Sequence, residues 1–170
     1  MIKYTLWNLF LALSVSHVAS AECPNFSGKW KGVCEQSGGP GRSHLNLALD
    51  IKQTGCDQFQ IGKITNSDTT YVDFFTMKCT SEHQMTSYHE ETKLNMASWP
   101  DEETLQTVTY SVGRFSDFVI NSRRETTQYK LEGQDLIVFK RDNGESLEVE
   151  KGGRQTTWEL NCRLQKKTDS

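Results

Sequence analysis

The chain has 170 residues, of which 24% are charged and 35% hydrophobic, and its formal net charge is −3. This length suits one ordinary domain, and a mild acidic excess without a dominant basic patch disfavours nucleic acid and anionic membranes as partners. The five cysteines include no C-x-x-C spacing, which gives little support to a zinc ribbon or a thioredoxin-like redox site.

The first 21 residues have the pattern of a secretory signal peptide. Lys3 supplies a positive charge, residues 6–15 form a mostly apolar run, and the Ala-Ser-Ala at 19–21 provides a cleavage site. The apolar run is shorter than the roughly 20 residues that a membrane-spanning helix needs. We therefore expect residues 22–170 to form one secreted or periplasmic domain without a membrane span, in which disulfides form.

After this segment, apolar and polar residues alternate as they do in half-buried β-strands. The clearest case is the segment 44–52, in which one face carries Leu45, Leu47, Leu49 and Ile51. Further short segments rich in Val, Ile, Thr, Phe and Tyr follow, separated by turn signals such as Asn143-Gly144, which suits a tight hairpin turn. Roughly nine or ten short strands predict an all-β fold, either an antiparallel up-and-down barrel or a sandwich.

One segment departs from this alternation. Residues 89–104 are polar and contain Trp99-Pro100, so we expect a long loop here. Long loops in compact domains are often lids or binding loops, and the alternative is a surface loop without a function.

Trp30 stands between Gly28 and Gly32 in the first predicted strand. A closed barrel would place this strand beside the last one, which contains Trp158, and we expect the two tryptophans to lie near each other. Glycines beside an indole leave room for it against neighbouring backbone, because they have no Cβ. Trp30 would then close one end of the barrel.

The Phe-x-Gly-x-Trp motif at 26–30, in a chain with strands to its end, resembles the lipocalins and, more broadly, the calycin barrels. The resemblance implies a single antiparallel up-and-down barrel of about 8–10 strands over 22–170. It also implies that a basic residue after the last strand packs across the motif tryptophan, for which Arg163 is the candidate and Lys166 the alternative. A cation over an indole contributes on the order of 0.5–2 kcal/mol. The residues expected to close the barrel are thus Gly28, Trp30, Trp158 and Arg163.

Barrel geometry also suggests a disulfide pairing. Strands that alternate in direction would bring four cysteines to the closed end, as the pairs Cys23–Cys162 and Cys56–Cys79. Cys34 would then be a buried free thiol. The alternative pair, Cys23–Cys34, would constrain only the first strand.

The sequence offers little catalytic or metal-binding machinery. It contains no G-x-S-x-G or H-E-x-x-H motif. His83 and His89 share a face if their segment is a strand, but they would lie roughly 20 Å apart, too far to bind one metal ion. We expect no enzymatic activity, no cofactor and no metal.

The barrel interior decides the expected function, because a small barrel is either filled by side chains or holds one small ligand. We expect it to hold a small, largely apolar molecule, with the 89–104 loop as a gate. The expected ligand-binding residues are Leu47, Leu49, Phe59, Trp99, Tyr110 and Phe118. The alternative is a secreted inhibitor or envelope interaction module with a filled core, whose loops contact a protein partner.

Overall fold

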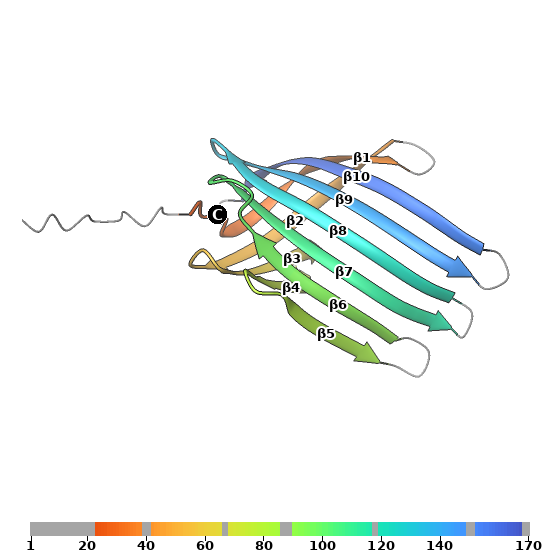
Figure 1. Ribbon diagram of the computed structural model, residues 1–170. Coiled ribbons are helices and arrows are strands. Elements are labelled where there is room, and N and C mark those ends of the chain that lie inside the picture. The colour runs from red at the N-terminus through yellow and green to blue at the C-terminus, as the bar shows by residue number, and fades with distance from the viewer. Residues whose placement is uncertain are drawn as a thin grey trace, which may run out of the picture.

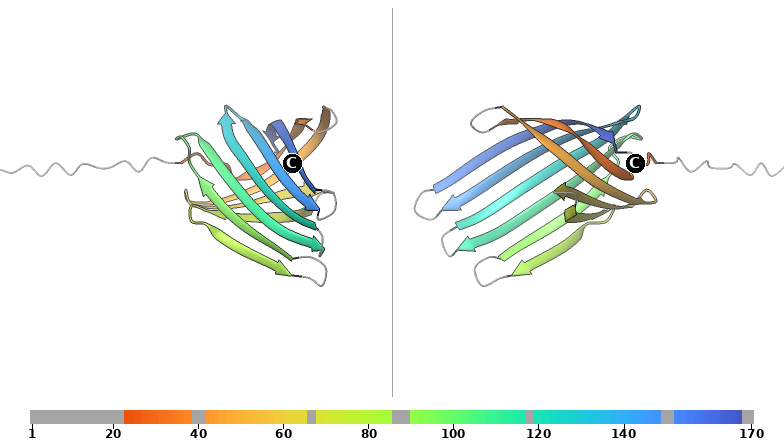
Figure 2. Two further views of the ribbon diagram at one scale, coloured as in Figure 1. Left: turned by 45° about the vertical axis from the view of Figure 1, so that its right-hand side comes forward. Right: turned by 180° about the vertical axis from the view of Figure 1, so that it is seen from behind.

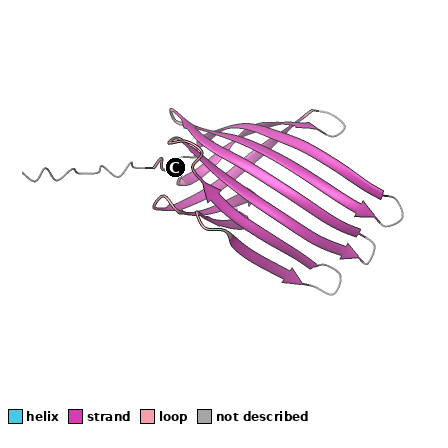
Figure 3. Ribbon diagram, viewed as in Figure 1, coloured by secondary structure: helices cyan, strands magenta, loops and turns pink. Residues whose placement is uncertain are grey.

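The computed structural model describes residues 23–38, 42–65, 68–85, 90–116, 119–148 and 152–167. All regular structure in this part of the chain is β-strand (Figure 3). The ten strands are β1 (Gly28–Gly38), β2 (Ser43–Thr54), β3 (Gln58–Thr65), β4 (Asp68–Thr76), β5 (Thr80–Met85), β6 (Glu90–Ser98), β7 (Thr104–Ser116), β8 (Val119–Glu132), β9 (Asp135–Glu148) and β10 (Gly152–Lys166). Among these residues, nothing forms a helix long and apolar enough to span a membrane.

The strands form one antiparallel sheet in the order β4-β3-β2-β1-β10-β9-β8-β7-β6-β5. The sheet curls into a nearly closed barrel (Figure 1), and the view from behind in Figure 2 shows β1–β4 lying across the longer strands. The predicted all-β, up-and-down barrel is therefore confirmed. The first and last strands are paired neighbours, as expected, and the two sheet edges are β4 and β5.

Trp30 lies opposite Lys166, near the end of the barrel at which the described chain begins and finishes (Figure 1). Trp30 is 3% exposed, and its indole Nε1 donates a hydrogen bond of 2.9 Å to the carbonyl oxygen of Phe26. Lys166 Nζ lies 5.4 Å from the centre of the indole. Phe26 also stacks on Trp99, whose Nε1 donates to the carbonyl of Cys56. Aromatic side chains thus plug this end.

Two expectations about Trp30 are wrong. It lies opposite Lys166, whereas Trp158 lies opposite Gly38 at the far end of β1. The cation over the indole is Lys166 and not Arg163, because side chains alternate along β10 and Lys166 shares the inward parity of Trp158. Arg163 points outward, where its Nε donates to Asp135 Oδ2 at 2.6 Å.

The predicted disulfide pairing is also wrong. The bonds are Cys23–Cys56 and Cys34–Cys162, and Cys79 is an exposed free cysteine. The register of β1 and β10 places Cys34 directly opposite Cys162, with 4.1 Å between their Cα atoms. Cys23 precedes β1 and lies beside the β2–β3 turn, where it meets Cys56. The prediction used only the directions of the strands, and these do not fix the register between β1 and β10.

The expected 89–104 loop is largely a strand, since β6 covers Glu90–Ser98, and His89 lies outside the described residues. Its alternation was missed because Lys93, Asn95 and Ala97 face inward while Leu94 and Met96 face outward. The expected Asn143-Gly144 turn lies inside β9. Pairing with β8 and β10 along both of its sides keeps this segment extended.

Gly32 marks a close approach between β1 and β10. A Cβ built on it would lie 2.2 Å from the Arg163 carbonyl oxygen and 3.0 Å from the Leu164 Cα. We expect Gly32→Ala to lower the free energy of unfolding by about 1–3 kcal/mol, because backbone must move to make room. Urea denaturation tests this, with Gly153→Ala as control, where the nearest atom to a Cβ is 3.9 Å away. Equal stability of the two variants would contradict the expectation.

Candidate functional site

The barrel encloses a cavity of about 470 Å³ with two chemically different walls. The apolar wall comes from β2, β3, β9 and β10, through Leu45, Leu47, Leu49, Ile61, Val138, Trp158 and Leu160. The polar wall carries charged side chains from β3, β4, β6, β8 and β9, namely Lys63, Asp73, Glu91, Lys93, Arg123, Glu125 and Lys140. The interior is therefore amphipathic, and not lined by apolar residues alone.

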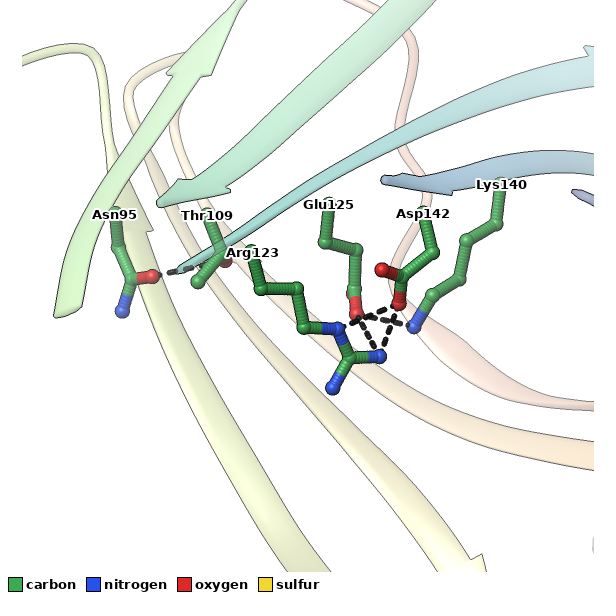
Figure 4. Close-up of polar contacts among 6 residues, drawn as sticks. All are labelled: Asn95, Thr109, Arg123, Glu125, Lys140 and Asp142. Carbon is green, nitrogen blue, oxygen red and sulfur yellow. Dashed lines mark hydrogen bonds and ion pairs between the residues drawn. The ribbon is translucent and has the colours of Figure 1, made fainter. Parts of the chain in front are cut away.

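Strand register explains why the polar side chains converge. Directly paired residues of antiparallel strands project from the same face of the sheet. One such row runs across β6–β9 and consists of Asn95, Thr109, Glu125 and Asp142. The neighbouring row holds Lys93, Ser111, Arg123 and Gly144. Figure 4 shows side chains from both rows gathered on this side of the sheet.

Three residues of these rows, Arg123, Glu125 and Asp142, form with Lys140 what we call the Arg123 cluster. Arg123 Nε donates to Asp142 Oδ2 at 2.6 Å, and Arg123 Nη2 contacts both Asp142 and, at 3.4 Å, Glu125 Oε2. Lys140 Nζ lies 2.6 Å from Glu125 Oε2. Asp142 is buried, with 3% of its side chain exposed, so its charge depends on Arg123 for compensation.

Gly144 lies directly opposite Arg123 on β9, and a Cβ built on it would lie 2.9 Å from Thr156 Oγ1. The hydrogen bond to Asp142 is the main reason that the pKa of the Arg123 guanidinium is raised above its usual value. Lys140 also lies over Trp158, with 5.3 Å between Nζ and the ring centre. The cluster thus connects the polar wall of the cavity to Trp158, an aromatic side chain of the apolar wall.

Asn95 extends the polar interior behind the cavity wall. It is 1% exposed, and its Oδ1 accepts a hydrogen bond of 2.9 Å from Thr109 Oγ1. Its Nδ2 has no hydrogen-bond partner among the described residues, and neither does the buried Oδ1 of Asn121. Unpaired buried polar atoms are costly, so this side of the barrel is not optimised as a packed core.

The structure separates the residues that were expected to bind a ligand. Leu47 and Leu49 line the cavity, so the alternation in β2 located them, while their role in binding stays a prediction. Phe59 and Trp99 instead contact each other at the plugged end, with their ring centres 6.0 Å apart. Phe118 lies outside the described residues.

Tyr110 was expected inside the barrel but faces outward, 42% exposed, with Arg124 over its ring. The inward residues of β7 include Thr109 and Ser111, which line the cavity beside the polar wall. The expectation failed because it assumed that aromatic residues face a barrel interior. The residues that it missed could be found from their spacing. Arg123 and Glu125, like Lys140 and Asp142, are charged residues two positions apart in a strand, so the members of each pair face the same side of the sheet.

Tyr129 is a buried residue that also lines the cavity. Burial raises the pKa of its phenol above the ordinary value, and the negative charge of Glu125 raises it further. Hydrogen bonds with Thr107 and Thr127 act in the opposite direction. The folded chain therefore keeps this proton at pH values where an unfolded chain loses it.

This difference predicts how stability changes in alkali. The contribution of Tyr129 is fully present below the ordinary tyrosine pKa of about 10 and is lost as the pH rises above it. We expect the free energy of unfolding of the wild type to fall more steeply between about pH 9.5 and 11 than that of Tyr129→Phe. Urea denaturation across this range measures it, with Tyr110→Phe as the control for loss of a hydroxyl. Parallel pH profiles for wild type and Tyr129→Phe would contradict the prediction.

No group of three or more His, Cys, Asp or Glu side chains in the described ranges has the geometry to hold a metal ion. No protein-family model matches the chain, and no curated protein matches it. Among solved structures, it is similar to the S-type phycobiliprotein lyase CPES from Guillardia theta, with a TM-score of 0.29 and 6% sequence identity, over 85% of this chain and 90% of that one.

This comparison corrects one prediction. The expectation that the chain has no enzymatic activity is contradicted, because the matched structure is that of a lyase, and we do not retain it. At a TM-score of 0.29, the match carries no argument about a substrate or a reaction of this chain.

Proposed function

We propose that the protein is a lipocalin-like barrel that binds one small amphipathic molecule in its interior. The observation that carries this proposal is the cavity of about 470 Å³, which has an apolar wall on one side and the Arg123 cluster on the other. Its volume lies within the roughly 300–1,000 Å³ that is usual for small-molecule sites. Because Trp30 plugs one end, we propose that the molecule enters at the opposite end of the barrel.

The proposed ligand differs from the largely apolar one that the sequence favoured. An apolar molecule would remove water from Arg123, Glu125 and Lys140 without replacing its hydrogen bonds, which costs free energy. A molecule with one polar end avoids this cost. We therefore propose that its apolar part lies along Leu47, Leu49 and Leu160, with its polar part towards β8 and β9.

We further propose that the protein works outside the cytoplasm. Its two disulfides are of a kind that forms and persists in oxidising compartments. The signal-peptide pattern of the first 21 residues supports the same location.

Titration with Nile red, a neutral amphipathic dye, tests ligand binding. We expect one dye molecule per chain, counted by native mass spectrometry, with enhanced dye fluorescence. Leu160→Phe adds volume at the cavity wall and is expected to weaken binding several-fold, whereas Val33→Phe, on the exposed outer face of β1, should leave it unchanged. Absence of dye binding, or equal loss in both variants, would overturn the proposal.

A second candidate function, recognition of a protein partner, is favoured by the outer face of β6 and β7. Leu94 and Tyr110 are paired and exposed there, next to Met96 and Val112. Contiguous exposed apolar patches often mark interaction sites. If this face binds a partner, Tyr110→Ser should abolish its capture without changing the Nile red titration.

A further inference from the structure

Both acids of the Arg123 cluster are already engaged by donors of the protein. Asp142 accepts from Nε and Nη2 of Arg123, and it lies behind the guanidinium with little exposed surface. Glu125 is held by Lys140 at 2.6 Å and by Arg123 at 3.4 Å. The cluster therefore has little remaining capacity to accept hydrogen bonds from a ligand.

Its donors are not used up. A guanidinium carries five N–H groups, and Arg123 Nη1 makes no hydrogen bond or ion pair with the described residues. Figure 4 shows this nitrogen on the side of the guanidinium away from Asp142. Lys140 has three N–H groups and one ion-pair contact, to Glu125. About half of the Arg123 side chain is exposed, so a bound molecule has access to the unused donors.

The charge of the cavity wall does not oppose an anion. Four cationic side chains line it, Lys63, Lys93, Arg123 and Lys140, against three acidic ones, Asp73, Glu91 and Glu125. Asp142 lies behind the wall, is paired with Arg123 and balances this count. The preference for an anion therefore rests on the unused donors of Arg123 and Lys140, and not on a net positive charge.

We infer that the cavity selects an amphipathic anion, whose carboxylate-like head accepts hydrogen bonds from Arg123 Nη1 and Lys140 Nζ. This inference rests on the proposed function and names the ligand class of the same site. The apolar chain of the molecule lies along Leu47, Leu49 and Leu160. Asp142 acts as a positioning residue, because it fixes the guanidinium through Nε and Nη2 and leaves Nη1 for the ligand.

Three probes of equal chain length test the inference: decanoate, decan-1-ol and decylammonium. Isothermal titration calorimetry at pH 7.4 should show decanoate binding at least about tenfold more tightly than decan-1-ol, as expected for a hydrogen bond to a charged group. Decylammonium should bind most weakly. Equal affinities for the three probes, or tightest binding of decylammonium, would overturn the inference while leaving ligand binding intact.

Variants then locate the selectivity. Arg123→Gln combined with Asp142→Asn removes both charges of the pair, so no lone buried charge threatens folding. It should bring decanoate to within about threefold of decan-1-ol, because the carboxylate loses the charged donor that the alcohol depends on less. Asp142→Asn alone should lower the same ratio, which a merely structural role would not change. The control is Arg124→Gln, the next residue of β8, which lies over Tyr110 on the outer face.

Two outcomes separate the inference from the proposed function. If the double variant binds decanoate as the wild type does, the Arg123 pair does not select the head group and the inference fails. If none of the three probes binds, the inference fails, and the Nile red titration then decides whether the proposed function fails with it.

Discussion

Replacing Cys34 and Cys162 together by alanine is expected to lower the free energy of unfolding by about 4 kcal/mol. The bond joins residues 128 positions apart and fixes β1 against β10, the two ends of the folded chain. Cross-linking so long a loop removes much of the entropy of the unfolded chain, by up to about 5 kcal/mol. Both side chains are buried, so alanine is chosen because serine would bury an unpaired hydroxyl.

Guanidinium chloride denaturation under non-reducing conditions measures this loss. Cys79→Ala is the matched control, because Cys79 is exposed and unbonded and should change stability by less than about 0.5 kcal/mol. The bond Cys23–Cys56 spans 33 positions, so its removal is expected to cost about 1 kcal/mol less by the same relation. A loss below about 1 kcal/mol for the Cys34/Cys162 pair would show that strand pairing alone sets the closure of the sheet.

The fold was predictable because its signal is local. The alternation at 44–52 appears as the inward row of β2, and the pairing of the first and last strands follows from closing an up-and-down sheet. The stagger between strands was not predictable in the same way. It places Lys166, and not Trp158, opposite Trp30, and it brings Cys34 to Cys162, which depends on side-chain packing across the whole barrel.

The candidate site was harder to predict because its inward residues are polar. Hydrophobic alternation identifies a wall such as Leu45, Leu47 and Leu49. On β6 and β8 the inward positions hold Lys93, Asn95, Arg123 and Glu125, so a search for apolar periodicity assigns the wrong face or finds no strand. For the same reason, Tyr110 was expected inside the barrel, and Arg123 was not predicted as a site residue. An interior lined by polar and charged side chains does not show the apolar alternation from which an ordinary hydrophobic core is predicted.

Trp30→Ala is expected to lower the free energy of unfolding by about 4 kcal/mol, within the range for deleting a buried aromatic side chain. The indole fills the plugged end, donates to the Phe26 carbonyl and lies under Lys166, so the substitution removes packing, a hydrogen bond and a cation–π contact together. Trp30→Phe keeps most of the packing and loses the indole N–H, and it should cost about 1–2 kcal/mol.

Urea denaturation of both variants, together with the Nile red titration, separates stability from binding. Because Trp30 plugs the end of the barrel away from the Arg123 cluster, Trp30→Phe should bind the dye as the wild type does. Lys166→Met removes the cation and keeps much of the side-chain length, so it should cost no more than about 1 kcal/mol. If Trp30→Ala were as stable as Trp30→Phe, the plugged end would not depend on the indole. The Phe-x-Gly-x-Trp motif would then have no structural role in closing this barrel.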